Sequence, residues 1–84
     1  MIPIQELLNR IKWDKSFGAG RFEITYYDRV EEKNIRIPMT DVFFDEADHF
    51  SFQCFDPEGE THTIPLHRIR EVFKDGKLIW HRKA

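Results

Sequence analysis

The chain has 84 residues, with 13 Lys and Arg against 15 Asp and Glu, so its formal net charge is 13 − 15 = −2. This length predicts one domain over residues 1–84, with no second domain to close over a cleft. Hydrophobic residues make up 40% of the sequence, which argues against intrinsic disorder. The single cysteine excludes an intramolecular disulfide, and no apolar run approaches the ~20 residues of a membrane span. Because no signal-peptide pattern precedes the domain, we expect a cytoplasmic protein.

The N-terminal residues predict a short amphipathic helix. Pro3 suits a first helical turn, and apolar residues follow at the spacing of one helix face, at Ile4, Leu7, Leu8 and Ile11. Asp14 and the segment Gly18-Ala19-Gly20 should end the helix. A helix of about ten residues is marginal alone in water, so its apolar face must dock on the rest of the chain.

From Arg21 the hydrophobic period changes from that of a helix to two, the period of a strand. Phe22, Ile24 and Tyr26 then share one face of a half-buried strand. Further strands are expected around 35–37, 41–44, 49–55 and 60–64, with Phe50, Phe52 and Cys54 sharing a face of the fourth. An acidic turn precedes that strand, and Asp56-Pro57-Glu58-Gly59 has good turn chemistry after it.

The C-terminal segment predicts a β-hairpin. Asp75-Gly76 between apolar segments favours a two-residue type I′ turn. That turn would pair Phe73 with Leu78, Val72 with Ile79, Glu71 with Trp80 and Arg70 with His81. Because both faces of this hairpin carry apolar residues, both should be covered. The expected fold class is α+β: an N-terminal helix packed on a small curved antiparallel sheet or partial barrel of five to seven strands.

The mild net charge hides a strong segmental pattern. Residues 37–63 contain seven acidic residues and no Lys or Arg, whereas residues 64–84 contain six basic residues against two acidic ones. A nearly neutral chain can therefore present a basic face to an anionic partner. The alternative is that the two segments pair across a sheet and cancel.

Several reactive residue types lack the spacing that chemistry needs. The possible ligands His49, Cys54, His62, His67 and His81 show no close pairing of the kind that binds metals, so neither a metal nor a cofactor is expected. The string Asp45-Glu46-Ala47-Asp48 reads as an acidic turn. His49-Phe50-Ser51-Phe52 matches half of the motif of two-histidine phosphoesterases, but the chain has no second copy.

The segment Ile64-Pro65-Leu66-His67-Arg68-Ile69 is more informative. Pro65 interrupts a strand ladder and places His67 and Arg68 at a corner between two strands. Arginine offers a planar fork for phosphate, and a charged histidine donates two hydrogen bonds. Arg29 and Arg82 could join them. The alternative is that Arg68 pairs with a carboxylate and His67 only caps the bend.

Four motifs together resemble the RNA cyclic-group-end recognition domain family, a family of archaeal-type small proteins. They are Ile11-Lys12-Trp13-Asp14, Tyr27-Asp28-Arg29, Ile64-Pro65-x-His67-Arg68-Ile69 and Gly76-x-x-Ile79-Trp80-x-Arg82, and the resemblance covers nearly the whole chain. Members of this family occur alone and joined to RNA-repair domains such as two-histidine phosphoesterases. The resemblance implies an RNA end with a 2′,3′-cyclic phosphate as ligand, and a separate protein as any catalytic partner.

The resulting hypothesis is a non-catalytic RNA-binding module for RNA repair or processing. Arg29, His67 and Arg68 would hold the terminal phosphate, Tyr27 or Trp80 would stack the last base, and Arg82 would follow the backbone. Two other classes stay open: a protein–protein interaction module without nucleic-acid binding, and a small phosphoesterase that uses His67 with His49 or His62.

Overall fold

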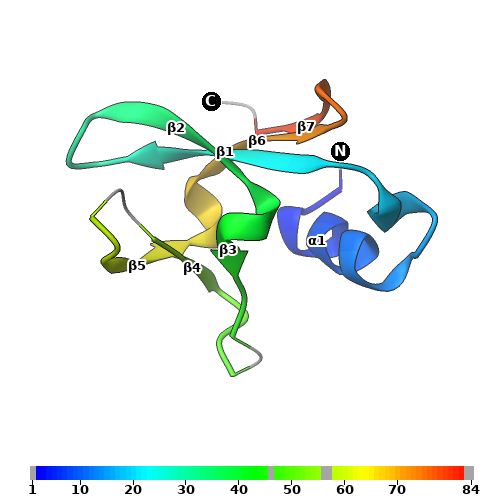
Figure 1. The fold of residues 1–84 in the computed structure, drawn as a ribbon, viewed down its shortest axis with the longest axis horizontal. Coiled ribbons are helices and arrows are strands. Elements are labelled where there is room, and N and C mark those ends of the chain that lie inside the picture. Colours follow the sequence, from blue (N-terminus) through cyan, green and yellow to red (C-terminus); the bar gives the residue numbers. More distant parts are fainter. Residues whose placement is uncertain (1, 46, 56–57, 83–84) are drawn as a thin grey trace.

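A computed structural model describes residues 2–45, 47–55 and 58–82, which form one α-helix and two antiparallel sheets (Figure 1). The four-stranded sheet has the order β2 (Lys33–Pro38), β1 (Phe22–Asp28), β6 (Ile69–Lys74) and β7 (Lys77–His81). The other sheet has the order β3 (Val42–Phe43), β4 (Ser51–Phe55) and β5 (Thr61–Pro65). The α+β class is confirmed, and the seven strands fall within the expected five to seven, but they form two sheets where one curved sheet or partial barrel was expected. The strands form two sheets and no closed barrel within the described residues.

Helix α1 (Ile4–Trp13) follows Pro3, as the sequence predicts. Ile4 and Leu7 are buried, and Leu8 and Ile11 are partly buried against the core. The helix ends at Asp14, whose Oδ1 accepts a hydrogen bond from the Phe17 amide at 3.1 Å. A Cβ atom at Gly18 would clash with the carbonyl oxygen of Ile11, so only glycine fits this turn.

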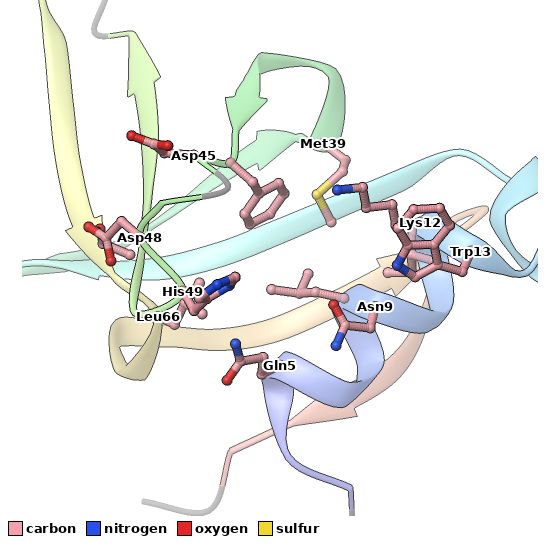
Figure 2. A pocket seen from close by; sticks show the side chains of 13 residues that line it. Gln5, Asn9, Lys12, Trp13, Met39, Asp45, Asp48, His49 and Leu66 are labelled. Carbon is pink, nitrogen blue, oxygen red and sulfur yellow. The ribbon is translucent and has the colours of Figure 1, made fainter.

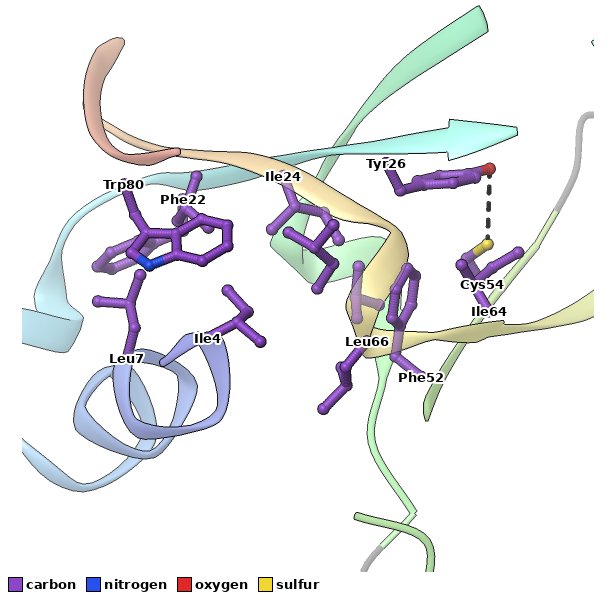
Figure 3. Packing of buried hydrophobic residues seen from close by; sticks show 13 residues of the cluster. Ile4, Leu7, Phe22, Ile24, Tyr26, Phe52, Cys54, Ile64, Leu66 and Trp80 are labelled. Atoms are coloured by element: carbon purple, nitrogen blue, oxygen red, sulfur yellow. Dashed lines mark hydrogen bonds between the residues drawn. The ribbon is translucent and has the colours of Figure 1, made fainter. Parts of the chain in front are cut away.

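The core lies where α1 and the three-stranded sheet meet one face of the four-stranded sheet (Figures 1 and 3). Ile24, Phe52, Ile69 and Val72 are its largest fully buried side chains. The ring of Tyr26 on β1 meets that of Phe52 on β4 edge-on, with centroids 5.8 Å apart, and so joins the two sheets. Burial, and then the neighbouring Cys54 thiol, raise the pKa of Tyr26 above its ordinary value.

The fourth strand is shorter than the sequence pattern predicts. It begins at Ser51, and Phe50 is 80% exposed rather than sharing the core face with Phe52 and Cys54. The cause is the turn at Asp48, whose carboxylate accepts hydrogen bonds from the Phe50 amide and the Ser51 hydroxyl. The expected turn at 56–59 lies partly outside the described residues, because 56 and 57 are not among them.

The last hairpin confirms the predicted turn but not the whole register. Asp75 and Gly76 both have positive φ, as a type I′ turn requires, and Phe73 faces Leu78. A β-bulge between Val72 and Phe73 then shifts the pairing by one residue, so that Val72 faces Trp80 and Glu71 faces His81. The bulge lets Val72 and Trp80 both enter the core. The second face is not covered, since Leu78 and Ile79 are 48% and 37% exposed.

Trp80 also ties the two ends of the described chain together. Its ring is 6% exposed, and its indole Nε1 donates a hydrogen bond to the carbonyl oxygen of Ile2 at 2.8 Å. Figure 3 shows the ring between Phe22 of β1 and Leu7 of α1. Trp80 therefore stabilises the contact between the helix and the sheet.

We predict that Trp80→Phe lowers the free energy of unfolding by ~1–3 kcal/mol, because the indole hydrogen bond is lost and a smaller ring leaves a gap. Chemical denaturation followed by circular dichroism measures the change. Trp13→Phe is the matched control, because the Trp13 side chain is 74% exposed, and it should change stability by less than ~0.5 kcal/mol. Equal effects of the two substitutions would contradict the anchoring role of Trp80.

The turn at Asp48 predicts a pH dependence. Hydrogen bonds from the Ser51 hydroxyl and the Phe50 amide favour the charged carboxylate and lower the pKa of Asp48 below its ordinary value. The turn is therefore stabilised at pH values above the unfolded pKa and loses this contribution as the pH falls through the lowered one. In an NMR titration, Ser51→Ala should raise the pKa of Asp48, and Ser51→Thr, which keeps the hydroxyl, should leave it low. A value unchanged by Ser51→Ala would rule out this cause.

Candidate nucleic-acid interface

The strand register brings five of the six predicted site residues to one end of the four-stranded sheet. Strands β1 and β6 are antiparallel, with Tyr26 opposite Ile69. The last residues of β1 and the Arg29 that follows therefore lie at the end of the sheet where β6 begins. The residues before β6 form the 3₁₀ helix η3 (Leu66–Arg68), which carries His67 and Arg68. The amide of Arg82 donates to the carbonyl oxygen of Arg70 at 2.8 Å, which places Arg82 at the same end.

We call this region the arginine end and define it by Arg29, Arg68, Arg70 and Arg82. Arg70 and Arg82 line a shallow groove of about 520 Å³, together with Asn34, Glu71, Leu78 and His81. The guanidinium carbon of Arg70 lies 5.7 Å from the centroid of the Tyr27 ring, within the range of a cation–π contact. Tyr27 and its cross-strand partner Asn34 lie on the face of the sheet opposite Tyr26, because neighbouring residues on a strand point to opposite faces.

Three of these arginines are available to an anionic ligand. Within residues 2–45, 47–55 and 58–82, no carboxylate forms an ion pair with Arg29, Arg68 or Arg70. The expected alternative of an Arg68–carboxylate pair is therefore not seen in this part of the chain. His67 is exposed on η3, and Arg68 is half-buried beside it. These guanidinium groups belong to residues at the end of the four-stranded sheet where β6 begins.

Arg82 has a different role from the other three. Its Nε donates a hydrogen bond to the carbonyl oxygen of Ile69 at 3.1 Å, and its Nη2 lies 3.5 Å from the carbonyl oxygen of Leu66. Its guanidinium carbon lies 5.2 Å from the Trp80 ring centroid. The Arg82 guanidinium thus uses Nε and Nη2 to hold the two ends of η3. Only its remaining N–H donors are left for the groove that Arg82 lines.

Trp80 lies in the core, as described above, and its ring is not displayed to a base. Base stacking on Trp80 would need the core to open, whereas Tyr27 lies half-exposed beside Arg70. Of the two expected stacking residues, the structure thus brings Tyr27 alone to the arginine end.

The acidic and basic segments belong to different sheets. The strands of the acidic segment, β3, β4 and β5, pair with one another, whereas β6 and β7 of the basic segment pair with each other and with β1. The ion pairs Arg36–Glu23 and Arg10–Asp14 join residues that lie outside both segments. Strand pairing therefore does not bring the acidic segment onto the arginine end.

Sequence reasoning missed Asn34, Arg70 and His81 as groove residues. The sequence does contain a pattern that could have identified the groove. Basic residues recur at 68, 70, 81 and 82, close to the ends of the two hairpin strands that lie away from the turn. The expected pairing of Arg70 with His81 was itself one residue out, because of the bulge.

The histidines and acidic residues of the described chain do not assemble a metal centre. No group of three or more His, Cys, Asp or Glu side chains in those ranges could hold an ion. His62 lies on β5, His67 on η3 and His81 on β7, while His49 precedes β4. No helix in the part of the chain that the structure describes is long and apolar enough to cross a membrane.

We predict that Arg82→Lys destabilises the fold by ~1–2 kcal/mol, because a lysine ammonium cannot bond both η3 carbonyls as a guanidinium fork does. Thermal or chemical denaturation measures this loss. Arg29→Lys, at an exposed position of the same end, is the control and should fall within ~0.5 kcal/mol of the parent. If Arg82→Lys were equally neutral, the η3 carbonyls would not depend on Arg82.

Comparison with known proteins agrees with the motifs. No curated protein and no solved structure matches the chain. A family model, the MJ1316 RNA cyclic group end recognition domain, matches residues 1–82 of the 84. This match covers the helix, both sheets and the arginine end. The chain therefore belongs to the MJ1316 RNA cyclic group end recognition domain family.

Proposed function

We propose that this domain is a non-catalytic module that binds RNA ends carrying a 2′,3′-cyclic phosphate, and that the arginine end is its binding surface. The observation that supports the proposal is that Arg29, Arg68 and Arg70 lie at one end of the four-stranded sheet, with no carboxylate paired to them in the described ranges, near the half-exposed Tyr27. The family description, which names the recognition of RNA cyclic ends, supports the same ligand.

The ligand and the surface have complementary chemistry. A 2′,3′-cyclic phosphate carries one negative charge, and its oxygen atoms accept hydrogen bonds but donate none. Guanidinium groups only donate, and a charged imidazole donates from both nitrogens. We assign the terminal phosphate to Arg29, Arg68 and His67, with Arg70 beside them on β6. An end with a free 3′-hydroxyl lacks the negative charge that the guanidinium groups favour.

The terminal base would stack on Tyr27. Base–aromatic stacking is worth roughly 1–3 kcal/mol and tolerates any base, so this contact favours binding without specifying sequence. The Arg70 guanidinium already lies near the same ring, and a base could share the stack with it. The open donors of Arg82, with Asn34 and His81 in the groove, would then contact the backbone that leads away from the end.

A module of this kind acts on RNA through another protein. We propose that it serves RNA repair or processing by holding a cyclic end for a separate enzyme. Its cellular location is expected to be the cytoplasm.

We predict that the full chain binds a single-stranded oligonucleotide with a 2′,3′-cyclic phosphate at least about tenfold more tightly than the same oligonucleotide with a 3′-hydroxyl. Fluorescence anisotropy at several salt concentrations measures both affinities. The logarithm of affinity should fall with the logarithm of salt with a slope of roughly −1.5 to −3, which corresponds to two to four phosphate contacts. The same oligonucleotide with a 3′-monophosphate is a third ligand. It carries charge but no cyclic phosphate, so its affinity distinguishes recognition of the ring from attraction to charge alone.

Arg68→Ala and Arg70→Ala should each weaken binding by at least about fivefold, which corresponds to about 1 kcal/mol for a lost phosphate contact. Arg21→Ala is the matched control, because Arg21 is exposed at the opposite end of β1 from Arg29. Equal affinity for cyclic and hydroxyl ends would remove end recognition from the proposal. If RNA affinity were unchanged in both arginine variants, the arginine end would not be the binding surface. If the parent bound no RNA at all, the protein-interaction module would become the preferred function.

One observation keeps a phosphoesterase as the second candidate. The amide of Leu66 donates to the carbonyl oxygen of Phe50 at 2.8 Å, which continues the β4–β5 pairing and brings the chain at His49 near the chain at His67. The binding reactions should therefore be analysed for opening of the cyclic phosphate. Product formation that disappears in His67→Ala would make the domain an enzyme, whereas an intact ligand agrees with a binding module.

A further inference from the structure

A second groove lies between α1 and the connection from β3 to β4. Its volume is about 480 Å³ (Figure 2). Its apolar lining consists of Leu8, Ile11 and Trp13 from α1 with Met39, Phe44 and Leu66 from the chain opposite. None of its lining residues lines the groove of the arginine end. The function proposed above does not use it.

Aromatic surface is left open in this groove. The Trp13 side chain is 74% exposed and that of Phe44 is 45% exposed. The Trp13 ring has the Lys12 ammonium 5.2 Å from its centroid, and Phe44 packs one side against Phe52 with ring centroids 6.4 Å apart. Large exposed aromatic groups next to a concave apolar surface are typical of interfaces, where tryptophan is often an energetic anchor.

The polar residues of this groove disfavour nucleic acid. Asp45 and Asp48 lie on its wall with His49, and Lys12 of α1 is the single Lys or Arg among its lining residues. Both carboxylates are fixed by the turn they occupy, because Asp45 accepts a hydrogen bond from the Ala47 amide and Asp48 accepts one from the Phe50 amide. The whole segment 37–63 to which this wall belongs contains no Lys or Arg. Phosphate groups would be repelled here, whereas lysine or arginine would be attracted.

We propose that this groove docks a basic, apolar peptide segment of a partner protein. An apolar side chain of the segment inserts between the α1 side chains and Phe44, where Trp13 covers it. Lysine or arginine side chains of the same segment lie beside Asp45 and Asp48. Apolar burial then supplies the affinity, and the two carboxylates select the charge of the partner.

The two sites can be occupied together. A segment bound between α1 and the β3–β4 connection leaves Arg29, Arg68 and Arg70 free for RNA. The domain then links an RNA end to a protein, and the two ligands are distinguished by opposite charge. This docking does not depend on the RNA proposal, because it rests on different residues.

The test uses a displayed library of random twelve-residue peptides selected on the full chain, followed by synthesis of the selected peptides and fluorescence anisotropy. We expect selected peptides to combine at least one large apolar residue with Lys or Arg. Trp13→Ala should weaken their binding at least about tenfold, as loss of an interface anchor does. Asp45→Asn with Asp48→Asn should weaken it about threefold or more and reduce its salt dependence. Asparagine keeps an oxygen that accepts the amide hydrogen bonds of the turn, so the double variant retains the local fold.

Phe50→Ala is the matched control, because Phe50 is exposed but does not line the groove, and it should leave peptide affinity within about twofold. Peptides whose basic residues are changed to Glu should not bind. The proposal is overturned if the selected peptides are acidic, or if none distinguishes the parent from Trp13→Ala. It is equally overturned if Trp13→Ala weakens RNA binding tenfold, which would make RNA the occupant. Conversion of a dimer to a monomer by Trp13→Ala would make the occupant a second copy of the chain.

Discussion

The corner at Pro65–Arg68 is the constraint on which the rest of the structure depends. Proline cannot donate to a ladder, so β5 ends there, and the Leu66 amide instead bonds the carbonyl oxygen of Phe50. The chain then passes through η3 into β6, while the Arg82 side chain bonds carbonyl oxygens of Leu66 and Ile69 at the two ends of the turn. These few hydrogen bonds fix where the three-stranded sheet meets the four-stranded one, and they set the position of His67 and Arg68.

This corner also separates the charges of the chain. Before it, the acidic segment forms a sheet of its own, and after it the basic segment joins β1. A net charge of −2 therefore describes neither surface, because strand pairing keeps the two segments in different sheets. The RNA surface and the peptide groove proposed above both depend on this separation.

The sequence predicts much of the local structure, since the helix, the strand positions and the type I′ turn follow from short-range patterns. It does not predict the division into two sheets or the bulge beside Val72, because both depend on how core side chains fit together after folding. For the same reason Trp80 was assigned to a ligand although it anchors Ile2, and Arg70 and His81 were missed. Arg82 shows that a family motif can include a residue that stabilises the fold, because its side chain bonds the carbonyl oxygens of Ile69 and Leu66.

Leu66 lines the groove between α1 and β4, while its neighbours in η3, His67 and Arg68, belong to the arginine end. Within η3, a peptide seated on Leu66 and an RNA end held by His67 and Arg68 would therefore lie on consecutive residues. Any coupling free energy between the two proposed surfaces has this turn as its shortest route along the chain. By thermodynamic reciprocity, whatever factor a bound peptide applies to RNA affinity, bound RNA applies to peptide affinity as well. Three consecutive residues thus connect the two proposed surfaces through the backbone alone.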